Sequence, residues 1–175
     1  MDFARALHEW HDFFVLVGTA GATLLALMFV AASLGAGILT AKSRTATRMY
    51  MSPVVSHFAF VFLMASFGLM PSQSAHSFAA LIGLTALIGI VSTAIISARL
   101  LAGFTDDIED RLAYGMLPAL GYFAALAAAV MILNGQEWSF HVLAGGLLLL
   151  VMVNIRNVWD LTLSMVRGQT THRRK

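Results

Sequence analysis

The sequence predicts an all-α integral membrane protein built as a bundle of five transmembrane helices. Hydrophobic residues make up 59% of the 175 residues and charged residues 11%, whereas an ordinary soluble domain carries about 25% charged residues. The charged residues leave four long uncharged stretches, Phe13 to Ala41, Met49 to Ala98, Leu112 to Gln136 and Trp138 to Ile155. One crossing takes about 20 apolar residues, so the second stretch holds two crossings and the total is five.

The first two helices are expected over about 10–41 and 52–70. A polar link from Lys42 to Arg48 separates them. Pro53 is tolerated in the first turn of a helix, and the second helix is expected to stop before Pro71 because proline restricts the residue that precedes it.

Three further helices are expected, over about 75–101, 106–134 and 138–166. Gly103 follows the first of these, and Asp106 with Glu109 three residues later matches a capping box at the start of the second. Asn134 and Gly135 form a short turn before the last helix. No linker is long enough to separate domains, so residues 1–175 are expected to form a single transmembrane domain.

Lysine and arginine residues gather at one end of the predicted bundle. The links after the first and third helices and the C-terminal tail contain Lys42, Arg44, Arg48, Arg99, Arg111, Arg167, Arg173, Arg174 and Lys175. The opposite side contains only Arg5. Because cytoplasmic connections hold the excess of lysine and arginine, we expect a multi-pass protein of a bacterial inner membrane, with the N-terminus outside, the C-terminus cytoplasmic and the lipid bilayer as partner.

The composition excludes several function classes. The chain has no cysteine, which excludes disulfide exchange, thiolate metal sites and cysteine nucleophiles. No Walker loop, HExxH, GxSxG or dinucleotide fingerprint is present, and this argues against an enzyme. The formal charge of +2 comes from cationic clusters beside the predicted spans, which argues against a nucleic-acid partner.

Small residues form ridges on several predicted helices, and one ridge is also polar. Thr85, Gly89, Thr93 and Ser97 recur every four residues and share a helix face. In one interpretation the ridge is a close helix contact whose hydroxyls bond to the preceding turn. In the other, Thr85, Thr93 and Ser97 line a wet path. Apolar ridges with the same spacing occur at Gly18, Ala22 and Ala26, and at Gly121, Ala125 and Ala129.

Polar residues follow the apolar run of the last predicted helix, at Asn154, Arg156, Asn157 and Asp160. From Trp138 to Ile155 the helix rises about 27 Å. One interpretation therefore places Arg156 at the inner interface, paired with Asp160 one turn later. The other places Asn154, Asn157 and Asp160 on one inward face near the mouth of a path, with Arg156 countering the acid.

Histidines concentrate at the predicted outer ends of the helices, while His57 alone lies near the inner face. A metal site would use the outer residues His8, His11, Asp12, His76 and His141. Imidazole and carboxylate groups on separate helices suit a divalent metal such as zinc. Haem ligation and pH sensing are further functional alternatives. In the remaining interpretation the histidines bind nothing and simply lie at the membrane interface.

Two main function classes remain open from the sequence. The first is a small homo-oligomeric channel or transport-type protein, favoured by the size of the chain, the small-residue ridges and the polar stripe. The second is a metal-binding or haem-binding membrane protein that uses the outer histidines. An accessory subunit of a larger membrane complex is a third interpretation.

Overall fold

The computed structural model describes residues 2–36, 41–99 and 115–172, with side chains described for 2–30, 33, 53–98, 115–160 and 162. These ranges contain no strand and six helices: α1 Phe3–Glu9, α2 His11–Ala36, α3 Ala41–Gly68, α4 Ala75–Arg99, α6 Leu117–Leu133 and α7 Ser139–His172. The prediction of an all-α fold is confirmed.

Three of these helices are long and apolar enough to cross a membrane, over His11–Val30, Ala75–Ala98 and Ser139–Asp160. Pro53–Gly68 and Leu117–Leu133 are apolar but shorter. Large hydrophobic side chains also point outward, such as Leu16 and Met116, which are 66% and 65% exposed. Long apolar helices with an apolar exterior indicate a membrane protein.

The N-terminal segment contains a short helix that the sequence did not predict. Asp2 caps α1, accepting a hydrogen bond from the backbone N–H of Arg5 at 3.4 Å. The helix ends at Glu9, and Trp10 is its C-cap before α2 begins at His11. Phe3, Leu7 and Trp10 pack against the core. This amphipathic arrangement explains why a segment with charged residues folds as a helix at the end of the bundle.

Helix α3 runs without a break from Ala41 to Gly68 and includes Pro53 in its interior. The expected link from Lys42 to Arg48 is therefore helical, and the expected helix start at about residue 52 is wrong. Lysine, arginine and alanine are good helix formers, which is consistent with a helical link. Pro53 leaves one carbonyl of the preceding turn without its helical partner but does not stop the helix.

The expected end of the first helix at about residue 41 is also wrong, because Ala41 is the first residue of α3. Helix α4 ends at Arg99, and α7 continues to His172, beyond the expected end at 166. The expected capping box of Asp106 and Glu109 lies outside the described residues. The turn after α6 is confirmed, with Gly135 at a φ of 67°, a left-handed conformation that glycine adopts without strain.

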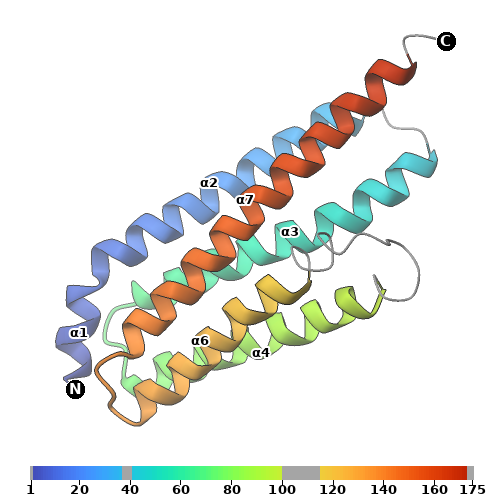
Figure 1. The fold of residues 1–175 in the computed structure, drawn as a ribbon. Helices are drawn as coiled ribbons and strands as arrows, with labels where there is room; N and C mark the ends of the chain where they lie inside the picture. Colours follow the sequence, from blue (N-terminus) through green and yellow to red (C-terminus); the bar gives the residue numbers. More distant parts are fainter. Residues whose placement is uncertain (1, 37–40, 100–114, 173–175) are drawn as a thin grey trace.

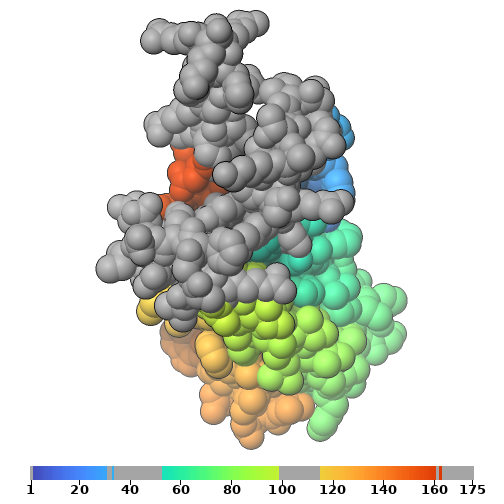
Figure 2. Space-filling model, turned by 90° about the vertical axis from the view of Figure 1, so that its right-hand side faces the viewer, coloured from blue at the N-terminus to red at the C-terminus, as the bar shows by residue number. Residues whose placement is uncertain are grey.

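Four helices form a ring in which each packs against the next: α3 on α4, α4 on α6, α6 on α7, and α7 back on α3. Helix α2 packs outside this ring, mainly on α3 (Figure 1). The space-filling view shows α3, α4 and α6 side by side on one face (Figure 2). We call the end with α1 and the two turns 69–74 and 134–138 the turn end, and the opposite end, toward His172, the tail end (Figure 1).

Small residues bring the helix backbones close together, as membrane helix packing requires. A Cβ added at Gly146 of α7 would lie 2.8 Å from the carbonyl oxygen of Gly121 in α6. A Cβ added at Gly21 of α2 would lie 3.4 Å from the backbone nitrogen of Phe62 in α3. The ridge of Gly121, Ala125 and Ala129 is buried. Its predicted role in close helix contact is confirmed.

Candidate functional site

A buried hydrogen bond crosses the interior of the four-helix ring. Nδ1 of His57 on α3 lies 2.6 Å from the hydroxyl oxygen of Tyr122 on α6. His57 is 1% exposed and Tyr122 is 0% exposed. Because α3 and α6 stand diagonally in the ring, this bond joins opposite helices through the centre of the bundle.

Residues of two other helices, α3 and α4, hold the Tyr122 ring in place. Gly89 of α4 lies against it, and a Cβ at position 89 would overlap the ring. Phe60 of α3 contacts it edge-on, with ring centroids 5.9 Å apart. The His57 ring lies 5.5 Å away and tilted. Gly89 is thus the member of the predicted polar stripe that makes room for Tyr122.

Two buried polar side-chain atoms, one of them on His57, have no partner in the part of the chain that the structure describes. They are Nε2 of His57 and Oδ1 of Asn154 on α7. The amide nitrogen of Asn154 donates to the carbonyl of Leu150 at 2.7 Å, and the residue is 0% exposed. Leaving such an atom unpaired costs about 1–3 kcal/mol. A cost of this kind at a buried position is typical of a site that takes a proton, a water molecule or a ligand.

The two unpaired atoms belong to α3 and α7, and these helices pack against each other. Val54 and Phe58, which flank His57 on α3, form a core cluster against which Val158 of α7 packs. Asn154 lies one turn before Val158 on the same helix. We therefore describe His57, Tyr122 and Asn154 as the central polar layer.

The structure buries some residues of the predicted polar path and leaves others partly or largely exposed. Thr85, Thr93, Asn154 and Asn157 are buried, and Ser97 is partly buried. The hydroxyls of Thr85 and Thr93 donate to Leu81 and Gly89 of their own helix, each at 2.8 Å. For these two threonines, the geometry matches the interpretation in which the ridge is a helix contact and each hydroxyl bonds to the preceding turn of its own helix.

Arg156 and Asp160 are exposed, whereas Asn154 and Asn157 on the same helix are buried. Their side chains are 44% and 47% exposed, and they pair at 3.7 Å across one helical turn. The geometry matches the interpretation in which Arg156 is paired with Asp160 at the surface. Only the two asparagines face the interior.

The outer residues proposed as metal ligands are not gathered into a site. His8, His11, Asp12, His76 and His141 are all exposed. His11 contacts Asp12 at 3.2 Å. Within 2–36, 41–99 and 115–172, no group of three or more histidine, aspartate or glutamate side chains is placed to hold a metal ion.

His141 lies among aromatic side chains. Its ring lies 4.9 Å from that of Trp10, edge-on, and 5.0 Å from that of Trp138. Amphipathic rings of this kind gather where a membrane meets water. His141 therefore belongs to an aromatic cluster at the turn end.

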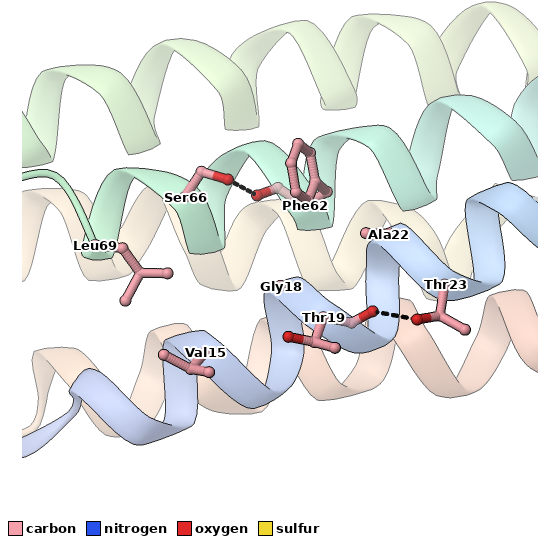
Figure 3. A pocket seen from close by; sticks show the side chains of 8 residues that line it. All are labelled: Val15, Gly18, Thr19, Ala22, Thr23, Phe62, Ser66 and Leu69. Atoms are coloured by element: carbon pink, nitrogen blue, oxygen red, sulfur yellow. Dashed lines mark hydrogen bonds between the residues drawn. The ribbon is translucent and has the colours of Figure 1, made fainter.

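A shallow groove between α2 and α3 is the other feature of the described surface. It has a volume of about 290 Å³ and is lined by Val15, Gly18, Thr19, Ala22, Thr23, Phe62, Ser66 and Leu69 (Figure 3). Thr23 and Ser66 donate to carbonyls of their own helices, each at 2.8 Å. The groove therefore offers mostly apolar contacts, unlike the central polar layer.

The sequence did not single out the bond between His57 and Tyr122, because 65 positions separate the two residues. Two weaker signals pointed to it. His57 is the one histidine within the long uncharged stretch that follows Met49 and precedes Pro71, and Gly89 interrupts a stripe of hydroxyl residues. Comparison of the chain with protein-family models, with curated proteins and with solved structures finds no match.

Proposed function

We propose that this chain is a small transport-type membrane protein and that its central polar layer passes protons through the bundle. The observation that supports the proposal is the state of His57, whose Nδ1 is held by Tyr122 and whose Nε2 is buried without a partner among the described residues. An imidazole with one nitrogen held and the other open can accept a proton at one atom and release a proton from the other. Ionisable residues inside a membrane are functional candidates by default.

The depth of the layer supports the same proposal. Eleven residues of α3 separate His57 from Gly68, the last residue at the turn end, which corresponds to about 16 Å at 1.5 Å per residue. The hydrocarbon core of a bilayer is about 30 Å thick. A bundle whose turn end lies at one interface thus holds His57 near the middle of the membrane.

The proposal includes five membrane crossings. Two of them would be the shorter apolar segments Pro53–Gly68 and Leu117–Leu133. Both belong to the four-helix ring and pack beside the long helices. Because α3 continues to Ala41, its total length of 28 residues exceeds the need of one crossing. The excess of lysine and arginine on the tail side supports a cytoplasmic C-terminus in a bacterial inner membrane.

The proposal also includes assembly as a homo-oligomer. The interior of the ring is filled by side chains such as Phe78, Leu143 and Leu147, each 0% exposed. A path wider than a proton relay would then lie between subunits, around a symmetry axis. The mass of the protein in detergent, from light scattering, tests this part of the proposal. A monomer would remove the symmetry axis but leave the central polar layer intact.

Proton flux into liposomes tests the main proposal. The purified chain is reconstituted with a pH-sensitive dye inside the vesicles, and a potassium diffusion potential drives protons inward. We expect flux above that of empty vesicles, and its loss in His57→Gln. His76→Gln, which changes an exposed histidine, should keep the flux. Flux equal to empty vesicles, or unchanged flux in His57→Gln, would overturn the proposal.

A further inference from the structure

The two unpaired atoms of the central polar layer differ in hydrogen-bond character. We propose that Tyr122 donates its hydroxyl hydrogen to Nδ1 of His57, that His57 carries its own proton on Nε2, and that one bound water molecule joins this N–H to Oδ1 of Asn154. The inference rests on the proposed function for its purpose, because this water would be the next member of the relay after His57. It concerns hydrogen-bond direction and can be measured without flux.

The direction of the bond between Tyr122 and His57 follows from counting donors and acceptors. A neutral imidazole has one N–H donor and one bare acceptor nitrogen, and the tyrosine hydroxyl has one hydrogen to donate. If Nδ1 held the proton and donated to Tyr122, the hydroxyl hydrogen would be buried with no acceptor among the described residues, and Nε2 would be a second unsatisfied group. With the proton on Nε2, the hydroxyl is satisfied and only the Nε2–H lacks a partner. Because each unsatisfied buried group costs stability, the proton belongs on Nε2.

Asn154 supplies the acceptor that this N–H lacks. Its amide nitrogen donates to the carbonyl of Leu150 at 2.7 Å, which fixes the orientation of the amide and leaves Oδ1 as the unpaired atom. A carbonyl oxygen can only accept, so the two unpaired atoms are one donor and one acceptor. Neither has a direct partner among the described residues. A water molecule can accept from Nε2–H and donate to Oδ1, and such bridges are nearly as favourable as direct bonds.

Both unpaired atoms belong to helix segments that run between two apolar clusters. Toward the tail end, Val54 of α3 and Val158 of α7 belong to one cluster. Toward the turn end, Val61 of α3 and Leu150 of α7 belong to the main core. On each helix, the residue with the unpaired atom lies between these two positions. The donor and the acceptor therefore share one level of the interior, and a bound water is the partner that suits a buried polar pair enclosed in this way.

Nitrogen NMR of the histidine-labelled native chain in detergent tests the hydrogen-bond direction. The chain has six histidines, and the signals that disappear in His57→Gln identify those of His57. At neutral pH we expect the form with protonated Nε2 and bare Nδ1 in about fivefold excess or more, because the other form strands the Tyr122 hydroxyl. We also expect a cross-peak between the Nε2 proton and water. A protonated Nδ1 in the main form would overturn the direction, and a missing water cross-peak would overturn the bridge.

Paired variants test whether Asn154 is the other end of the bridge. His57→Leu and Asn154→Leu each remove one end and leave the other unsatisfied, whereas the double variant removes both. We therefore expect the double variant to lose less in unfolding midpoint than the sum of the two single losses. Thr85→Val is the matched control, because Thr85 is also buried but its hydroxyl is bound to the carbonyl of Leu81, so its loss should add to that of His57→Leu. Additive losses for His57→Leu and Asn154→Leu would overturn the bridge.

The two proposals fail separately. A protonated Nε2 with a water cross-peak, but without proton flux into liposomes, would overturn the proposed function and leave the bridge standing. Proton flux that depends on His57, with the proton on Nδ1 or with additive losses for His57 and Asn154, would keep the function and overturn the bridge.

Discussion

Replacing Gly89 with alanine is expected to destabilise the protein, because the new methyl group would occupy the space of the Tyr122 ring. The ring cannot move freely. It is 0% exposed, contacted edge-on by Phe60, and tied to His57 through its hydroxyl. Adding a methyl group to a well-packed core costs about 1–3 kcal/mol.

Gly83→Ala provides the matched control on the same helix. A Cβ at position 83 would lie 3.6 Å from Cβ of Ala129, an ordinary contact distance. Both variants gain the same helix propensity, about 1 kcal/mol for alanine over glycine. The difference between them therefore isolates the overlap with Tyr122. It should equal about 1–3 kcal/mol, or about 2–12 °C in the unfolding midpoint for a chain of this size.

The assay is thermal unfolding in detergent, followed by circular dichroism. Gly89→Ala should unfold below the native protein, and Gly83→Ala at or above it. A Gly89→Ala midpoint equal to or above that of Gly83→Ala would show that the ring of Tyr122 does not pack on α4 as the structure has it.

Two further predictions concern packing and topology. Gly146→Ala should lower the unfolding midpoint in detergent, because a Cβ at position 146 would meet the Gly121 carbonyl oxygen at 2.8 Å. Gly145→Ala should not lower it, because a Cβ at position 145 has nothing within 4 Å. Equal midpoints would contradict this contact between α6 and α7. In whole cells, an impermeant thiol reagent should label Ser72→Cys from outside and leave Ser43→Cys unlabelled. The reason is that the excess of lysine and arginine lies on the Ser43 side of the membrane. The reverse labelling pattern would invert the proposed orientation.

The sequence was informative about elements whose signal is local. The all-α class followed from long apolar stretches, and the turn at Asn134 and Gly135 from residues that favour such a turn. The helical segment around Pro53 was not predictable in this way. Proline usually marks a helix boundary, and packing against neighbouring helices overrides that preference here.

The candidate site depended on contacts between distant parts of the chain. Asn154 and Asn157 were predicted from their position in an apolar helix, and their burial agrees with one of the two interpretations. The sequence could not decide that Asp160 faces away, because a helix face becomes inward only through its neighbours. Tyr122 carried no local signal, since its role comes from His57 and Gly89 on other helices.

The central polar layer raises the question of whether it stabilises the fold or serves a function, and a double variant separates the two. Tyr122→Phe removes the partner of Nδ1 and leaves both nitrogens of His57 unpaired, at a cost of about 1–3 kcal/mol. His57→Leu in turn leaves the Tyr122 hydroxyl without its partner. The combination of both changes leaves no polar atom from this pair in the interior.

Replacing both partners of a buried hydrogen bond by apolar groups is often neutral or stabilising. We therefore expect the double variant His57→Leu, Tyr122→Phe to unfold at or above the midpoint of each single variant, within about 1 kcal/mol of the native protein, and to conduct no protons. Thermal unfolding and liposome flux measure the two effects on the same samples. A double variant less stable than either single variant would assign the layer to the stability of the fold. If removing the pair keeps the stability of the protein but abolishes proton flux, the role of the pair is proton transfer and not stabilisation of the fold.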